Sequence, residues 1–439
     1  MKKIKITALV LLCIVTAGLC GIFAYGMAGH DIYRIGYGSR LGDNGFADAY
    51  GSPQLVLEKE VPLDGIDSIS IQYNMNSNDI YLYESDNEYL TIKEYNELEL
   101  ADDMLSTVTV KGSSLDVKGK RRDGKRYQIQ VGMFGMRTAL GYTEIGLPPS
   151  YKGQLVLSTV SGDISSQMDI VLEKDFMAST SSGDVSAPLI TAKNVTVKCT
   201  SGDVKVDTIQ AETNGSAGEI HITTSSGDID GKQFAGDAHL KSTSGDIEVD
   251  QFVGNADIQS SSGYFEAEAI SGEAQIATTS GNISVRRIDG TVKLRTASGD
   301  VEVYEGSGGR TAKTTSGDVT LNGVDGVWDI ETSSGGVVLG ATKGSGRVAA
   351  TSGDIRLEIG DLTGNLDMRS SSGYVNIKMS PGNAFDFRAE TSSGDIDTFF
   401  DDSLSFSKKG NNAHGTYGEN SDGHDVIIRT TSGDIRITK

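Results

Sequence analysis

The chain has 439 residues, with 39 basic and 60 acidic side chains and a formal net charge of −21. Such an acidic balance argues against nucleic acid as a partner, because phosphate contacts need a basic surface. The 55 glycines are spread along the chain, which indicates a repeat rather than one flexible linker. Cys13 and Cys20 lie in an apolar run, so Cys199 has no partner for an internal disulfide in the rest of the chain.

Residues 1–28 are predicted to be a signal anchor. Lys2, Lys3 and Lys5 precede a mainly apolar run that can cross a bilayer as a helix of ~20 residues. Under the positive-inside rule the basic flank stays in the cytoplasm. We therefore expect a single-pass protein of the cytoplasmic membrane with an extracytoplasmic C-terminal body. The alternative is a cleaved signal peptide and a secreted body, although the apolar run is longer than in most signal peptides.

Two further segments precede the repeat. Residues 29–60 are rich in glycine and are expected to be a linker. Residues 61–150 alternate apolar and polar side chains in IDSISIQY and YLTIKEY but lack the repeat signature. We expect them to form an N-terminal β cap, since the first coil of a repeat would otherwise expose an unpaired strand edge.

Residues 151–439 carry an 18-residue Ser-Gly-Asp repeat. A second glycine recurs out of phase with the first, from Gly236 to Gly344, so each repeat has two turns and two strand-length segments. We expect a corner at each Ser-Gly-Asp, where glycine permits a positive φ and aspartate bonds backbone N–H groups. The first glycine, termed the corner glycine, occupies these positions in the regular part: Gly227, Gly245, Gly263, Gly281, Gly299, Gly317, Gly335 and Gly353.

The columns of the repeat identify the strand faces. The positions five before and two after the corner glycine are mostly apolar, as at Ile258 and Ile283, and therefore point inward. Coils stacked at ~4.8 Å then form an all-β, two-sheet parallel β-solenoid. A Thr/Ser column, exemplified by Thr296, is expected to form hydrogen bonds along the stack. The long step from Gly394 to Gly433 predicts a loop inserted in the last coil near residues 401–423.

The motif IGLPPSYKGQLVLSTVSGDI, the repeated TSSGDI and TTSGDI, and the final TTSGDIRI resemble the putative-adhesin family of bacterial SGD-repeat proteins. The resemblance covers about Val61 to Lys439. It implies a surface β-solenoid of unknown molecular activity, with some relatives in Gram-positive envelope-stress responses, and it brings no catalytic residues. Four positions depart from the aspartate that follows the corner glycine, which counts against any function that needs an unbroken row: Tyr264, Asn282, Gly336 and Tyr374.

One face of the repeat is predominantly acidic. We interpret it either as a solvated surface or as a face that captures cationic peptides or wall components by electrostatic steering. This acidic face consists of outward positions three and five after the corner glycine: Asp230, Glu248, Asp250, Glu266, Glu268, Glu302 and Glu358.

Other candidate sites are weaker. The aspartate column, from Asp228 to Asp354, has the carboxylates of a calcium site but lacks the glycine-rich ligand loop of calcium β-rolls, so turn residues are the favoured interpretation. An irregular row from Thr223 to Ala349 argues against ice binding. The histidines show no ligand or triad spacing. We therefore predict no catalytic, cofactor-binding or metal-binding residues, and no cofactor.

These observations predict a non-catalytic surface scaffold or adhesin-like binding module. Its expected partners are the membrane, through the N-terminal helix, and a cell-wall polymer, an envelope protein or a cationic peptide. One alternative is an envelope-stress sensor that captures cationic peptides on the acidic face. A carbohydrate-active β-helix enzyme is a remote alternative, because such enzymes need convergent carboxylates and the narrow coils leave no evident pocket.

Overall fold

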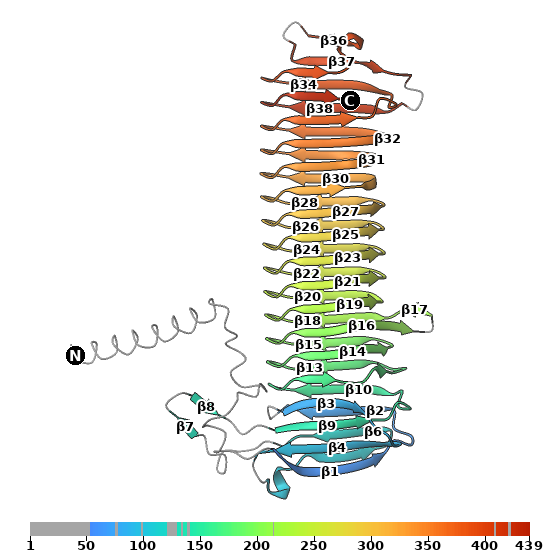
Figure 1. Cartoon of the computed structure of the whole chain (residues 1–439), viewed down its shortest axis with the longest axis vertical. Coiled ribbons are helices and arrows are strands. Elements are labelled where there is room, and N and C mark those ends of the chain that lie inside the picture. The colour runs from blue at the N-terminus through green and yellow to red at the C-terminus, as the bar shows by residue number, and fades with distance from the viewer. Residues whose placement is uncertain are drawn as a thin grey trace, which may run out of the picture. The chain divides into compact units, whose positions relative to one another are not determined.

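The computed structural model describes residues 53–74, 78–97, 100–120, 130–132, 135–137, 141–213, 215–407, 410–419 and 423–439. The expected signal anchor and residues 29–52 of the expected linker lie outside these ranges. Within them, no helix is long and apolar enough to cross a membrane. The unit from Ser52 to Lys439 is all-β, and a long ladder of strands runs through it as in a β-solenoid (Figure 1).

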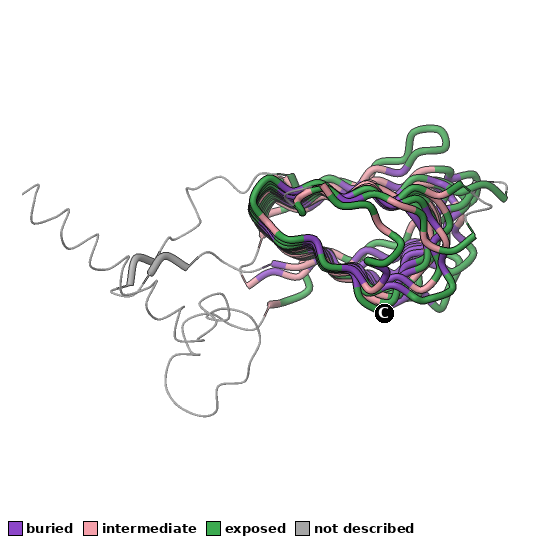
Figure 2. The backbone as a smooth tube through the Cα atoms, turned by 90° about the horizontal axis from the view of Figure 1, so that it is seen from above, coloured by how far each residue is buried: buried purple, intermediate pink, exposed green. Residues whose placement is uncertain are grey.

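Each coil of the repeat contains two strands that pair with their equivalents in the next coil. β21 (Ile247–Val253) pairs in parallel with β23 (Phe265–Ser271), and β22 (Ala256–Gln259) pairs in parallel with β24 (Ala274–Ala277). Equivalent positions of neighbouring repeats therefore lie side by side, as the sequence period predicts. Seen from above, the coils overlie one another closely (Figure 2).

Strands that follow a Ser-Gly-Asp corner form one parallel ladder, termed the first ladder. Besides β21 and β23, its members as far as residue 379 are, in spatial order, β11 (Ile164–Ser166), β14 (Val185–Ala192), β16 (Val204–Thr213), β19 (Ile229–Ala235), β25 (Ile283–Asp289), β27 (Val301–Ser307), β29 (Val319–Asn322), the first parts of β31 (Val337–Ala350) and β32 (Ile355–Ser370), and β33 (Val375–Met379).

Strands that precede a corner form the second ladder. Besides β22 and β24, its members as far as residue 370 are β10 (Gln154–Thr159), β13 (Phe176–Ser179), β15 (Val195–Lys198), β18 (Glu219–Thr223), β20 (Asp237–Lys241), β26 (Val292–Arg295), β28 (Arg310–Lys313), β30 (Val324–Thr332) and the second parts of β31 and β32. Two short strands lie beside the first ladder, β12 (Ile170–Val171) and β17 (Ser216–Ala217).

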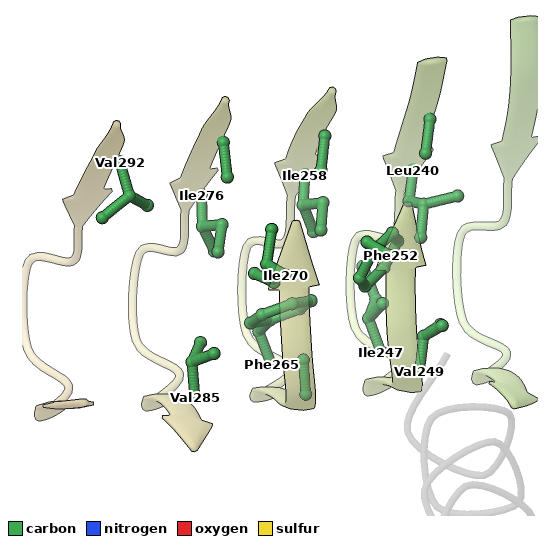
Figure 3. Close-up of a cluster of buried hydrophobic side chains, with 14 of the residues drawn as sticks. Leu240, Ile247, Val249, Phe252, Ile258, Phe265, Ile270, Ile276, Val285 and Val292 are labelled. Atoms are coloured by element: carbon green, nitrogen blue, oxygen red, sulfur yellow. The ribbon is translucent and has the colours of Figure 1, made fainter. Parts of the chain in front are cut away.

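The inward columns form one continuous core. Leu240, Ile258 and Ile276 lie in consecutive coils and are at most 1% exposed (Figure 3). On the facing ladder, Ile247 and Phe265 are fully buried in the same way. Each such side chain contributes about 1.5–3 kcal/mol when it leaves water, so the stacked columns are the main source of stability.

The corner glycines are required for a reason that differs from the expected one. None has a positive φ; positive values belong to the second glycine row, for example +123° at Gly254 and +143° at Gly272. At each corner glycine of the regular part, an added Cβ would overlap the carbonyl oxygen of the preceding corner glycine. The expectation of a positive φ at Ser-Gly-Asp is therefore wrong, because close backbone stacking is what excludes a side chain there.

Threonine and aspartate side chains connect the corners. Thr296 Oγ1 accepts from the Gly299 N–H at 3.0 Å and donates to the Gly281 carbonyl of the preceding coil at 3.1 Å. The Asp246 N–H donates to Asp228 Oδ1 at 2.8 Å, so the aspartate column also joins successive coils. The predicted hydrogen bonding of the Thr/Ser column along the stack is confirmed, and the carboxylates have a structural task.

Cys199 interrupts the Thr/Ser column. Burial raises the pKa of its thiol to about 12, and the nearby Asp184 and Asp203 carboxylates add to the rise, so the thiol stays protonated. A thiol is a poor acceptor for the Gly202 N–H compared with a hydroxyl.

We expect Cys199→Thr to raise the free energy of unfolding by about 1 kcal/mol, the net value of one buried hydrogen bond. Urea unfolding measures this change. Cys199→Val is the control, because valine has the shape of threonine without the hydroxyl. Equal stability of the threonine and valine variants would show that the hydroxyl is not what the column needs.

The N-terminal strands close one end of the stack. β2 (Ser68–Tyr73) and β3 (Asn78–Glu84) form a coil that pairs in parallel with β10 and β11. On their other side, residues 114–118 and 141–147 also pair with them in parallel, and antiparallel strands lie farther out. The remaining elements before residue 150 are β1 (Gln54–Pro62), β4 (Tyr89–Asn96), η3 (Asp102–Met104), β5 (Thr107–Lys111), β6 (Ser114–Lys118), β7 (Gln130–Gly132), β8 (Gly135–Arg137) and β9 (Gly141–Leu147).

Strand β1 corrects the expected linker. It begins at Gln54 and pairs with β4 in antiparallel register through Pro62, so the stretch expected to be a linker up to residue 60 is already structured. β4 also pairs in antiparallel register with β9. The backbone groups of these strands find partners in the sheet rather than in water.

The C-terminal end has a different order in space from its order in the chain. β38 (Asp425–Thr430) pairs with both β32 and β34 (Phe385–Thr391), and β39 (Ile435–Thr438) pairs with both β33 and β35 (Ile396–Thr398). The last residues of the chain therefore form the penultimate coil, and β34 with β35 forms the outermost one (Figure 1).

The segment predicted as an inserted loop contains structure. Residues 401–423 include η4 (Asp401–Ser403), β36 (Leu404–Phe406) and β37 (Asn412–Tyr417). β37 pairs in antiparallel register with β34 and with β36. The loop prediction is wrong because these strands cover the outer edge of β34, whose backbone groups would otherwise lack partners.

Candidate binding surface

The structure brings together five of the seven predicted acidic residues. Asp230, Glu248 and Glu266 are register neighbours on β19, β21 and β23. Asp250 and Glu268 follow two residues later on β21 and β23, and these five residues are termed the acidic patch.

Two predicted residues lie apart from the acidic patch. Glu302 is two coils beyond Glu266, with Ser284 between them in the row. Glu358 lies on β32, three coils farther along. The predominantly acidic face expected from the sequence is interrupted at these coils, because they place uncharged or basic side chains in the same rows.

Basic side chains neutralise several of these carboxylates. Lys205 lies 3.9 Å from Asp230, Arg286 lies 3.3 Å from Glu268, and Lys378 lies 2.8 Å from Glu358. Ion pairs this exposed contribute about 0–1 kcal/mol each. The negatively charged surface ends at these ion pairs.

The centre of the acidic patch keeps its charge. Glu248, Asp250 and Glu266 make no ion pair with any described residue. Burial raises the pKa of Glu248, and the Asp230 and Glu266 carboxylates raise it further. The pKa of Asp230 is likewise raised by burial, against the opposing effect of Lys205. Carboxylates stacked in this way repel one another, so a bound cation would relieve the repulsion.

Two tyrosines beside these carboxylates were not predicted as site residues. The Tyr264 hydroxyl donates to Glu248, and the Tyr304 hydroxyl donates to Glu302 at 2.6 Å. Both rings are exposed, at 37% and 44%. The sequence does contain one indication of these two site residues, since each is an aromatic residue at an outward position. An exposed ring next to a carboxylate suits a lysine or arginine side chain, through cation–π attraction as well as charge.

Two concave regions of the outer surface lie near the C-terminal end. A groove of about 740 Å³ runs along the second ladder beside the corners, lined by Arg369, Arg429, Glu390 and a series of Ser and Thr residues. A smaller hollow of about 250 Å³ lies on the first ladder around Tyr374. Both are open to solvent and polar, unlike an enclosed apolar pocket.

The described ranges contain no group of three or more His, Cys, Asp or Glu residues that could hold a metal ion. His221 and His239 stack at 4.8 Å between ring centroids, and His221 Nε2 lies 2.9 Å from Glu219 Oε2. These two rings come from consecutive coils on the outer surface of the second ladder.

Comparison with known proteins gives one family match. The model of a family described as Toastrack DUF4097 matches residues 66–269, 214–325 and 310–438. No curated protein matches the sequence.

Solved structures with detectable similarity include three bacterial proteins. A "putative cell adhesion protein" from Clostridium sporogenes is 9% identical, with 88% of this chain and 99% of that chain covered and a TM-score of 0.19. A "putative adhesin" from Parabacteroides merdae is 10% identical over 74% and 95% of the two chains, with a TM-score of 0.23. One from Parabacteroides distasonis is 12% identical over 74% and 96%, with a TM-score of 0.21.

Proposed function

The chain belongs to the Toastrack DUF4097 family, and from that premise we propose that it is a non-catalytic, adhesin-like binding module that displays its coils outside the cytoplasmic membrane. The observation that supports the proposal most strongly is that the inward and outward positions of each coil have different roles. Inward columns such as Ile258 and Ile276 fill the core, while outward positions repeat at every coil on two long ladders. Such a surface offers many equivalent contacts at once, and multivalent contact strengthens adhesion without any single tight site.

Retention on cell envelopes tests this proposal. Beads coated with the full-length chain are expected to be retained on isolated bacterial cell walls, while beads coated with the heat-denatured chain are not. Equal loss of both kinds of bead would contradict an adhesin-like function.

The proposed location rests on residues 1–28, with their basic flank and apolar run. Protease added to intact, wall-stripped cells should degrade the body from outside. Complete protection of the chain would contradict an extracytoplasmic body. Complete release of the body into the medium would favour a cleaved signal peptide instead of an anchor.

Capture of cationic peptides is a second candidate function, and the acidic patch favours it. Glu248 and Glu266 make no ion pair with a described basic side chain, and Tyr264 adds an exposed ring. A peptide with several Lys or Arg residues would match both features. A protein that sensed envelope stress would use such capture to detect membrane-active peptides.

We expect the triple variant Glu248→Gln, Glu266→Gln and Glu302→Gln to bind a cationic peptide about tenfold more weakly at low salt, a change of about 1.4 kcal/mol. Wild-type binding should also weaken as salt rises, because the Debye length falls to ~10 Å at 0.1 M. Fluorescence anisotropy with a labelled oligolysine measures both effects.

A matched triple variant controls for net charge. Glu273→Gln, Glu331→Gln and Glu390→Gln remove three charges at sites outside the acidic patch. This control should bind oligolysine like the wild type. If both triple variants weaken binding equally, total charge rather than the acidic patch together with Glu302 is responsible, and binding that survives high salt would rule out electrostatic capture.

A further inference from the structure

Tyr374 occupies a corner position that aspartate fills in most coils. The Tyr374 N–H donates to Asp354 Oδ1 at 3.0 Å, so the residue receives the usual link from the preceding coil. Its own side chain has no carboxylate that could accept the corresponding backbone N–H of the next coil. The side chain is instead 58% exposed. Because this departure from the repeat gives up a structural hydrogen bond, it indicates that Tyr374 has a role on the surface.

The neighbours of Tyr374 form a regular array on the first ladder. Along the chain and across the coils, the ring is flanked by two carboxylates, two guanidinium groups and one carboxamide. In register, Arg356, Asn376 and Arg436 form one row beside the row that contains Tyr374. The members of the array, termed the tyrosine array, line the hollow of about 250 Å³: Asp354, Arg356, Tyr374, Asn376, Asp434 and Arg436.

Contacts with neighbouring residues fix the polar groups of the tyrosine array without occupying all of their hydrogen-bond donors and acceptors. Arg356 Nη2 lies 3.0 Å from Asp354 Oδ2, and Arg436 Nε lies 3.3 Å from Asp397 Oδ2. Asp434 Oδ1 accepts the Asp395 N–H at 3.0 Å. Each guanidinium has five N–H donors and each carboxylate about four acceptor sites, so these contacts leave most of this capacity available to a ligand.

The charge balance distinguishes this hollow from the acidic patch. The lining contains two carboxylates and two guanidinium groups, and just outside it Asp397 pairs with Arg436 and the Asp395 N–H binds Asp434, so guanidinium groups offset much of the negative charge there, unlike at the centre of the acidic patch. The acidic patch is also distant: the coils of Gly245 and Gly373 are seven steps apart, about 34 Å at ~4.8 Å per step, which exceeds the Debye length of about 8 Å at physiological salt.

We propose that the tyrosine array is a subsite for one pyranose ring of a neutral saccharide chain. The apolar face of the sugar would lie on the Tyr374 ring, because its C–H groups match the negative face of an aromatic ring. Ring hydroxyls both donate and accept, so they match a site that presents guanidinium donors beside carboxylate and carboxamide acceptors. An aromatic surface with a few converging polar groups is the usual construction of a small-molecule site.

The other exposed tyrosines of the first ladder support this assignment by contrast. Tyr264 and Tyr304 direct their hydroxyls to Glu248 and Glu302. Tyr374 instead lines a hollow together with two guanidinium groups and a carboxamide. Tyr264 is therefore a matched control position.

Tyr374→Asp separates binding from folding, because it restores the repeat. The new carboxylate would accept the Asp434 N–H as other aspartates of the column do, so the variant should be at least as stable as the wild type. Removal of the ring should weaken saccharide binding about tenfold. Tyr374→Phe keeps the ring and should stay within about threefold, whereas Tyr264→Ala should leave binding unchanged.

The test uses the full-length chain and saturation-transfer NMR, which detects contacts of millimolar affinity. The probes are neutral tetrasaccharides of glucose, mannose, galactose and N-acetylglucosamine, with tetralysine and a tetrauronate as charged comparisons. We expect transfer to the ring C–H protons of at least one neutral probe, and its loss in Tyr374→Asp. Absence of transfer to every neutral probe, stronger binding of a charged probe, or unchanged binding by Tyr374→Asp would each overturn the inference.

This inference rests on the proposed binding function, and the bead assay distinguishes failure of the inference from failure of that function. If the beads are retained on cell walls but no neutral probe contacts Tyr374, the saccharide subsite is wrong and the adhesin-like function stands. If the beads are not retained while a probe contacts Tyr374, the subsite stands and the adhesin-like function is wrong.

Discussion

Gly281→Ala is expected to destabilise the coils on both sides of residue 281 by on the order of 4 kcal/mol or more, which is exceptional for one methyl group. The added Cβ would overlap the Gly263 carbonyl oxygen, and both atoms belong to the backbone. A flexible side chain could move away, but here two coils must separate. Separation would break the ladder bonds next to the corner, such as Phe265 N–H to the Asn282 carbonyl at 2.9 Å.

Gly309→Ala is the matched control for this prediction. At Gly309 the nearest atom to an added Cβ is Thr291 Cγ2 at 3.8 Å, an ordinary contact, and φ is not positive. This variant should stay within about 0.5 kcal/mol of the wild type. Urea unfolding followed by far-UV circular dichroism measures both variants. Equal stability of the two would contradict the close stacking of corner glycines.

Deletion of residues 425–439 is expected to detach the outermost coil as well as remove the penultimate one. Val426, Ile428, Ile435 and Ile437 are at most 2% exposed. Loss of four such side chains removes about 6–12 kcal/mol of burial, at about 1.5–3 kcal/mol each. The deletion also leaves β34 and β35 without the strands that join them to the rest of the stack.

Hydrogen exchange distinguishes this result from simple shortening of the stack. Amides of β34 should lose protection in the deletion variant, whereas those of β21 and β23 should keep theirs, because each coil of a solenoid contacts mainly its neighbours. Deletion of Lys439 alone leaves β39 complete and serves as the control. Persistent protection of β34 would mean that the coils follow chain order after all.

Local chemistry made much of the solenoid predictable. A strand alternates its faces with period two, so the apolar columns at Ile258 and Ile283 identified the inward face directly. An unbroken 18-residue period allows one register between neighbouring coils, and Ile247 lies opposite Phe265 as that period requires. The hydrogen bonds of Thr296 to its own corner and to the preceding one follow from the same register.

The candidate sites were less predictable because they depend on pairs of coils. Lys205 neutralises Asp230 across the irregular step from Gly202 to Gly227, where the period fails. The sequence identified Asp230, Glu248 and Glu266 as outward residues, but not which basic side chains lie beside them. Tyr374 was visible only as a departure from aspartate, since its neighbour Arg436 comes from a coil more than 60 residues later in the chain.

The sequence by itself determined the strand faces, the coil period and the family, because these depend on residues within one repeat or on adjacent repeats. Tertiary structure alone decided that β38 and β39 insert before the outermost coil, since nearly identical Ser-Gly-Asp corners fit next to one another in more than one order. It also decided why the corner residue must be glycine: the backbone of one coil lies against the next with no room for a Cβ, and that distance exists only once the coils are stacked.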